Sequence, residues 1–267
     1  DFAMQMLIDT KPQYFSDLVR IAGLAHGTDV WLGNAQTLIK EGKATISTAI
    51  CTRDDIMIYL IQKGLDSEES FKIMEMVRKG KVASGKCKEW PEWKQDMIDH
   101  GVPDWYIWSC ERIKYMFPKA HAAAYVMMAW RVAYCKVFYP LAYYTAYFSI
   151  RATAFDYEKM AMSPVRLEHY IAEYKAKKAE GTISNTEEDE LGVMRIVQEM
   201  HARGYEFTPV DIYKAKARTF QIIDGKIMPS FKVISKVGEV AGESIEIAAR
   251  DGEFLSKDDL RQRARIG

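Results

Sequence analysis

The strongest constraint on the fold is a long, mostly apolar run in the middle of the chain, AHAAAYVMMAWRVAYCKVFYPLAYYTAYFSI, at residues 120–150. A membrane-spanning helix needs about 20 nearly uncharged residues in succession. Arg131, Lys136 and Pro140 interrupt this run. The pattern therefore predicts a long helix buried in a protein core, which ends near Pro140 and is followed by a second helix.

Length and charge limit the classes of protein that fit the rest of the chain. The 267 residues are 48% hydrophobic, which is enough for one large domain or two ordinary ones. Lys plus Arg equals Asp plus Glu at 37 each. The net charge therefore gives no overall attraction to nucleic acid or to an anionic membrane, and any basic surface must be local.

The four cysteines, Cys51, Cys87, Cys110 and Cys135, are widely separated and form no Cys-x-x-Cys pair. Structural zinc sites usually contain such close pairs, so the spacing argues against a zinc site. The sequence also shows no signal peptide. Together these features predict a reducing, cytoplasmic location.

The hydrophobic pattern divides the chain into two regions. From residue 15 to about residue 150 it is helical almost throughout. The composition then becomes polar and charged, most clearly in EYKAKKAEGTISNTEEDE, which places a domain border near residue 160. Beyond it, Asp224 and Gly225 predict a β-hairpin turn. We therefore expect a mainly α protein, with a helical domain followed by a small α-rich domain that contains a short β-hairpin.

The segment VISKVGEVAGESI partly fits a helix-hairpin-helix element at about residues 230–250. Ile234, Val237, Gly238 and Ile245 match that pattern, whereas Lys236 replaces its first glycine. In such an element the bend and the second helix direct backbone N–H groups at a phosphate without reading any base. The alternative is two packed helices joined by a short turn.

Local charge favours the phosphate-binding interpretation. Basic residues outnumber acidic ones between Tyr205 and Lys236, although a solvated charged face would explain the same excess. The residues expected to contact DNA are Lys214, Lys216, Arg218, Lys232, Lys236, Val237, Gly238 and Val240.

Three segments together carry a family resemblance, and they are FSDLVRIAGLAHGTDVWLGNAQTLI, ICTRDDIMIYLIQKG with FKIMEMVRKGK, and FPKAHAAAYVMMAWRVAYCKVFYP. They resemble the fingers region of C-family bacterial replicative DNA polymerases. The string HGTDVW is similar to the PolC type of DNA polymerase III alpha subunit. Near the C-terminus, GEFLSKDDLRQR resembles the closing part of that family's duplex-binding domain.

This resemblance implies that residues 1–158 are fingers that bind the incoming deoxynucleotide and the template. It implies that residues 159–267 are a duplex-binding domain. It also implies primer-template DNA, a sliding clamp and the palm, thumb, PHP and exonuclease domains as partners. The aspartates that hold Mg²⁺ for nucleotidyl transfer belong to the palm in this family. We therefore expect no catalytic or metal-binding residue in this chain, and no polymerisation by the chain alone.

Fingers must present cations to a triphosphate, so the resemblance also implies nucleotide-binding residues. The candidates are Arg78, Lys79, Lys81, Arg53, Lys114, Lys119 and His26. For the first three there is a structural alternative, because cations complement the dipole at a helix C-terminus. His26 could equally be a core histidine, and the opposing functional hypothesis is a helical adaptor that binds proteins through its Trp-rich surface.

Overall fold

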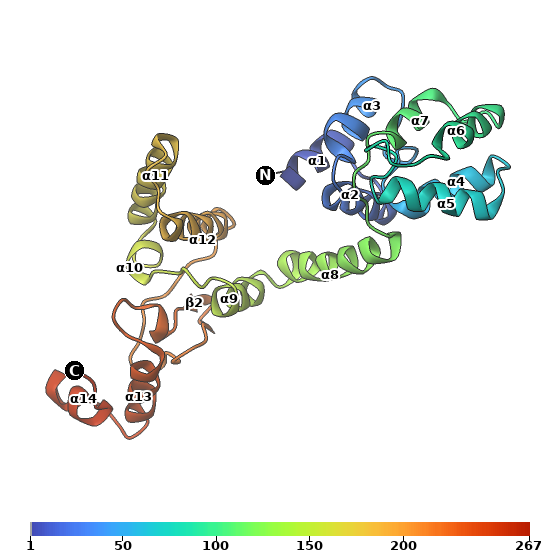
Figure 1. Cartoon of the computed structure of the whole chain (residues 1–267). Coiled ribbons are helices and arrows are strands. Elements are labelled where there is room, and N and C mark those ends of the chain that lie inside the picture. The colour runs from blue at the N-terminus through green and yellow to red at the C-terminus, as the bar shows by residue number, and fades with distance from the viewer. Residues whose placement is uncertain (1) are drawn as a thin grey trace. The chain divides into compact units, whose positions relative to one another are not determined.

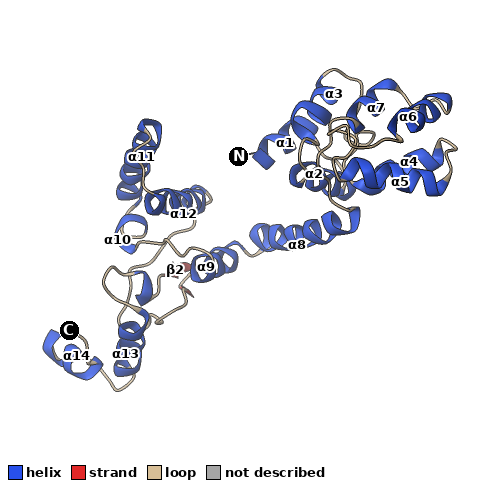
Figure 2. Ribbon diagram, viewed as in Figure 1, coloured by secondary structure: helices blue, strands red, loops and turns tan. Residues whose placement is uncertain are grey.

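The computed structural model describes residues 2–267 and is mainly helical, with fourteen α-helices and one two-stranded sheet among those residues (Figures 1 and 2). The expected fold class is therefore confirmed. Two compact units of similar size comprise residues 1–131 and residues 132–267. Each unit is described by itself below.

The first unit consists of helices packed around a main hydrophobic core. Its elements are α1 (Phe2–Thr10), α2 (Phe15–His26), a kinked turn η1 (Trp31–Ala35), α3 (Gln36–Lys40), α4 (Arg53–Gln62), α5 (Ser67–Arg78), α6 (Trp90–Asp99), α7 (Asp104–Cys110) and the start of α8 (Lys119–Phe138). A second, smaller hydrophobic cluster lies between α2 and α8. The helices α4 and α5 lie side by side (Figure 1).

The sequence of α5 explains where this helix begins, ends and packs. The Asp66 carboxylate accepts hydrogen bonds from the backbone N–H groups of Glu68 and Glu69, at 2.9 and 3.0 Å, and so caps the N-terminus. Apolar side chains at helical spacing, including Ile73 and Val77, are buried in the core. The polar face of the helix is thereby left for charged residues.

The second unit contains the rest of the helices and the sheet. Its elements are the end of α8, α9 (Pro140–Ile150), α10 (Tyr157–Met160), α11 (Pro164–Glu180), α12 (Asn185–Ala202), β1 (Gln221–Ile223), β2 (Lys226–Met228), a 3₁₀ turn η2 (Phe231–Val233), α13 (Glu239–Ala249) and α14 (Lys257–Ala264). The strands are antiparallel and joined at Asp224 and Gly225, so the predicted β-hairpin is confirmed.

The boundary between the two structural units lies earlier in the sequence than the border near residue 160 that the composition indicated. Ring centroids of Phe155, Phe207 and Phe220 lie 5.3 to 5.8 Å from that of Phe148 in α9. Aromatic pairs at such separations stabilise a core. Residues 140–158 therefore pack into the second unit, and a division at 158/159 remains a functional hypothesis.

Helix α8 corrects the prediction of a long buried helix. It ends at Phe138 and α9 begins at Pro140, as expected. Of its 20 residues, however, only Ala122 and Val126 are buried. Met127 and Trp130 are 49% and 55% exposed, so the expectation that the whole run forms a core was wrong. Within residues 2–267, no helix combines the length and the apolar character needed to cross a bilayer.

The predicted helix-hairpin-helix is also only partly matched. Its second helix is present as α13, but the first is the three-residue 3₁₀ turn η2 rather than an α-helix. Lys236, where the pattern has glycine, adopts a left-handed conformation with φ of 66°. The bend therefore keeps the backbone geometry that glycine would favour, at some cost in strain.

Candidate functional site

The segment between α7 and α8, residues 111–118, ties distant parts of the first unit together, and we call it the strap. Beyond the end of α2, the Thr28 N–H donates to the Tyr115 carbonyl at 2.8 Å, and the Lys114 N–H donates to the Thr28 carbonyl at 3.1 Å. The Lys114 ammonium also lies 2.7 Å from the Asp29 carboxylate. These contacts hold the loop after His26 against the strap.

The strap also bonds to α4 and α5. The Arg53 N–H donates to the Phe117 carbonyl at 3.1 Å, and the Met116 N–H donates to the Arg78 carbonyl at 3.3 Å. The first residue of α4 and the last residue of α5 are therefore fixed to one stretch of backbone. This arrangement brings together Arg53 and Arg78, which are 25 positions apart in the sequence.

Three of the predicted nucleotide-binding cations meet at one carboxylate. Glu75 accepts a hydrogen bond from the Arg78 guanidinium at 2.9 Å, lies 2.9 Å from the Lys79 ammonium, and is 3.7 Å from Arg53. The hydrogen bonds from Arg78 and Lys79 lower the pKa of Glu75 to about 2. These four side chains have a net charge of +2, so a polyanion could bind them with Glu75 still ionised.

An aromatic cluster lies beside these cations. The Phe117 ring stacks on His121 at 4.9 Å between centroids, and His121 lies 4.6 Å from Tyr125. The His26 ring packs edge-on against Phe117 at 6.0 Å. Tyr115 and Tyr125 are 44% and 60% exposed. The cluster therefore offers aromatic faces to solvent next to a cationic patch, which suits a ligand that has both a base and phosphates.

The other predicted nucleotide-binding residues lie around this site in different settings. Lys81 is exposed just beyond the C-terminus of α5. Lys119 lies 3.9 Å from the Asp55 carboxylate, and Lys114 is paired with Asp29 as described. The structure thus brings Arg53, Arg78 and Lys79 together at the Glu75 carboxylate. The other three lysines do not contact that carboxylate, and they are Lys81, Lys114 and Lys119.

In the second unit, three of the predicted DNA-contacting residues lie at an exposed helix N-terminus. Gly238 is the N-cap of α13, and a side chain added to it would meet no atom within 4 Å. Lys236 is exposed beside it, and Val240 is 77% exposed. Unpaired N–H groups at such a terminus attract anions.

Several other predicted DNA contacts are engaged within the protein. Arg218 donates to the Glu243 carboxylate at 2.7 Å and lies 3.5 Å from that of Glu239. Lys216 lies 3.3 Å from the Glu246 carboxylate. These acidic side chains of α13 neutralise much of the positive charge that the sequence placed beside the hairpin.

Of the remaining three predicted DNA contacts, two are lysines that interact with oxygen atoms of the protein and one is a valine in an apolar cluster. The Lys232 ammonium donates to the Ser149 carbonyl at 2.8 Å, and Lys214 lies 3.9 Å from the Asp211 carboxylate. Val237 packs against the small core around α13 and α14. Lys236 is therefore the hairpin lysine whose side chain is exposed at the α13 N-terminus.

Mg²⁺ binding finds no support in the described residues. Across residues 2–267, no three side chains of His, Cys, Asp or Glu are grouped so that they could hold a metal ion. Mg²⁺ prefers carboxylate ligands with near-octahedral geometry.

Sequence comparisons show which known proteins this chain resembles. Residues 1–101 match the model of the bacterial DNA polymerase III alpha subunit finger domain. Over 266 residues the chain is 50% identical to the DNA polymerase III PolC-type of Bacillus cereus, and that match covers 99% of the chain. This chain is homologous to a segment of PolC-type DNA polymerase III.

Other PolC-type relatives match over the same extent. The chain is 49% identical to the protein of Streptococcus suis over 263 residues and 48% identical to that of Bacillus subtilis over 265 residues. It spans 18% of the length of each of these relatives, while they cover 98% and 99% of the chain. The similarity to PolC-type proteins therefore includes both structural units.

Sequence reasoning missed two features of the first unit that the PolC-type comparison does not assign either. Glu75 lies three and four residues before Arg78 and Lys79, a spacing that permits ion pairs on a helix, and that signal was available. The aromatic cluster of Tyr115, Phe117 and Tyr125 was not foreseeable in the same way. Its rings come together through strap contacts that no local pattern encodes.

Proposed function

We propose that this chain is part of a replicative DNA polymerase, and that residues 1–158 act as fingers that bind the incoming deoxynucleoside triphosphate and the template. The observation that supports this most is the convergence of Arg53, Arg78 and Lys79 on Glu75, next to exposed aromatic rings. A triphosphate would compete with Glu75 for these cations, and the aromatic faces would accept the base.

The test is binding of a fluorescent deoxynucleoside triphosphate to the chain. Replacing Arg78, Lys79 and Lys81 together with Ala should weaken triphosphate binding by at least about tenfold, because charge-assisted contacts contribute 1.5–3 kcal/mol each. Replacing Lys40, Lys43 and Lys63 with Ala changes the net charge equally and serves as the control. Equal loss in both variants would make the effect one of overall charge and would remove the basis for the site.

Within the same function, we assign duplex contact to residues 159–267 through the N-terminus of α13. Lys236 and the backbone around Gly238 would contact phosphates of the primer-template duplex without reading bases. Support comes from the left-handed φ of Lys236 and the open space at Gly238. Because Lys216 and Arg218 are paired with glutamates, we give them a smaller share of the affinity.

Salt titrations of duplex binding test this assignment. Lys236→Ala should weaken binding equally for unrelated sequences and lower the slope of log affinity against log salt by about one unit. Lys175→Ala, on the exposed surface of α11, is the matched control. An unchanged slope in Lys236→Ala would contradict the contact.

The proposed function places nucleotidyl transfer itself in other domains of the polymerase. The palm with its Mg²⁺, the thumb, the PHP and exonuclease domains and the sliding clamp would be partners of this chain. The Mg²⁺ ligands would belong to the palm, so we assign no step through Mg²⁺ to the residues described above.

A further inference from the structure

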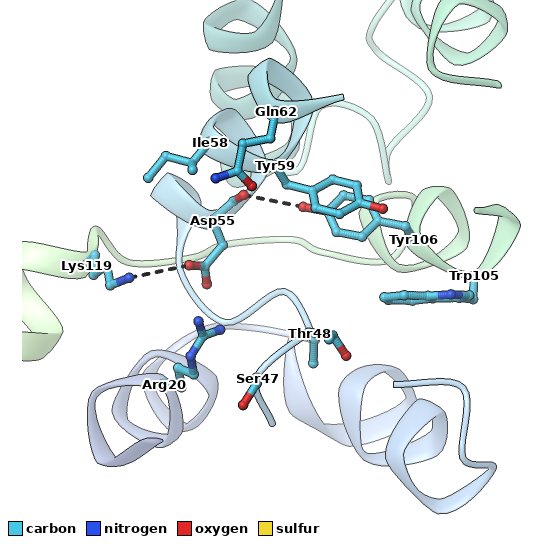
Figure 3. Close-up of a pocket in the computed structure, with 11 residues that line it drawn as sticks. Arg20, Ser47, Thr48, Asp55, Ile58, Tyr59, Gln62, Trp105, Tyr106 and Lys119 are labelled. Atoms are coloured by element: carbon cyan, nitrogen blue, oxygen red, sulfur yellow. Dashed lines mark hydrogen bonds and ion pairs between the residues drawn. The ribbon is translucent and has the colours of Figure 1, made fainter. Parts of the chain in front are cut away.

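A pocket of about 360 Å³ opens in the first unit beside α4 (Figure 3). It is formed by residues from α2, α4 and α7, by residues 47–49, and by the first residue of α8. The volume lies within the range of small-molecule sites. Neither the sequence pattern nor the family comparison assigns a ligand to it.

The two sides of this pocket differ in chemistry. Arg20 and Lys119 lie on one side, and Trp105 presents its indole on the other, with Ser47 between them (Figure 3). A wall with two cations suits a phosphate, and an indole face suits a planar base. The pocket therefore has a cationic side and an aromatic side, the two features that the phosphate and the base of a nucleotide require.

The one carboxylate in the pocket is occupied by contacts of its own. Asp55 accepts hydrogen bonds from the backbone N–H groups of Cys51 and Thr52, at 3.1 and 2.9 Å. Asp55 also lies 3.9 Å from the Lys119 ammonium and forms a salt bridge with it (Figure 3). Asp55 therefore caps the N-terminus of α4 and offsets one of the two positive charges, so Arg20, Lys119 and Asp55 together keep a net charge of +1 that attracts an anion.

The pocket is connected to the proposed nucleotide site. The Lys119 N–H donates to the Asp54 carboxylate at 2.6 Å, directly beside the strap contact of Arg53. Residues 53–55 thus face the cation cluster through Arg53 and the pocket through Asp55.

We propose that this pocket binds one nucleotide of an unpaired DNA strand, with its phosphate at Arg20 and Lys119 and its base stacked on Trp105. The inference rests on the proposed polymerase function and adds a site for the unpaired template. The recognised chemistry is a nucleoside monophosphate unit, which a free nucleotide and a single strand both contain. Stacking on aromatic faces is tolerant of sequence, as template binding requires.

The test is titration of the chain with a fluorescent oligo-dT single strand. Trp105→Leu and Arg20→Gln should each weaken binding, the first by about tenfold and the second with a reduced salt slope. Trp105→Phe should restore much of the affinity, because phenylalanine keeps a stacking face. Trp108→Leu and Arg112→Gln are the matched controls, since both residues lie in the first unit outside the pocket.

Comparing free dTMP, oligo-dT and a triphosphate shows whether the pocket binds a free nucleotide or a strand. It also tests the pocket separately from the proposed polymerase function. Free dTMP that binds as tightly as oligo-dT would overturn the strand assignment. Oligo-dT affinity equal in Trp105→Leu, Arg20→Gln and the controls would overturn the pocket, while triphosphate binding that still depends on Arg78 would leave the proposed function standing. Loss of triphosphate dependence alone would contradict the function but not the pocket.

Discussion

Gly80 lies so close to Lys114 that a side chain on the glycine would overlap the strap backbone, with its Cβ 2.5 Å from the Lys114 carbonyl oxygen. Gly80 also has a φ of 69°, which favours glycine. Gly80→Ala should therefore destabilise the chain by about 1–2 kcal/mol from the backbone conformation and by a further 1–3 kcal/mol from the overlap. Urea unfolding of the two proteins measures the difference.

The nearby turn at Gly85 provides a control for that prediction. Gly85 has nearly the same φ, 68°, but a Cβ there would meet no atom within 4 Å. Gly85→Ala should show only the conformational cost. If both variants lose the same stability, close approach of the strap is not what requires glycine at position 80.

The low pKa of Glu75 predicts an acid-dependent contribution to stability. The folded-state pKa is depressed from 4.5 to about 2, so the stabilisation is present above about pH 4.5 and is lost as pH falls towards 2. After allowance for solvent screening it should amount to about 1–2 kcal/mol. Urea midpoints between pH 3 and pH 7 should fall less steeply at low pH for Glu75→Gln than for the unsubstituted chain.

Glu68→Gln is the matched control, because Glu68 is on the same helix and pairs with Lys72 at the exposed surface. Its urea midpoints should follow the pH dependence of the unsubstituted chain. A Glu75→Gln profile that coincides with that of the unsubstituted chain would show that the cations do not hold Glu75 ionised.

Two neighbouring positions on α8 should differ in how much stability the chain loses when their side chains are truncated. Val126 is 8% exposed and packs in a small cluster with Val19, so Val126→Ala should cost about 1–2 kcal/mol. Met127 is half exposed, so Met127→Ala should change stability by less than about 0.5 kcal/mol. Thermal melting of both variants checks the pair, and a larger loss for Met127→Ala would place that side chain in a core.

Thiol reactivity should distinguish one cysteine from the other three. Cys135 is exposed on α8, whereas Cys51, Cys87 and Cys110 are buried, and burial raises the pKa of each of these three thiols. A maleimide reagent at pH 7 should therefore label one thiol rapidly in the folded chain. Cys135→Ser should abolish the rapid phase, and rapid labelling of that variant would contradict the burial of the others.

Local pattern was sufficient to predict several elements of this fold. Pro140, which follows the end of α8 and begins α9, and the turn at Asp224 and Gly225, which joins the two strands, are both short-range signals. In each case the residues that determine the structure are within a few positions of one another.

Burial and site geometry were not predictable in the same way. The apolar composition of residues 119–138 indicated a core, but the packing of a helix depends on which surfaces meet it, and α8 leaves Met127 and Trp130 exposed. The convergence of Arg53 with Arg78 likewise depends on hydrogen bonds to a strap that follows them in the sequence. Hydrophobicity and spacing carry no information on such long-range pairing.

The position of the strap has a consequence for the order of folding. Residues 111–118 bond to Thr28, Arg53 and Arg78, which precede them by tens of positions, and loops of that length close more slowly than local helices form. Helices α2, α4 and α5 can therefore form during synthesis well before Phe117 has left the ribosome. The cation cluster would be completed only afterwards, so a nascent chain stopped after α6 would be helical and still lack the assembled site.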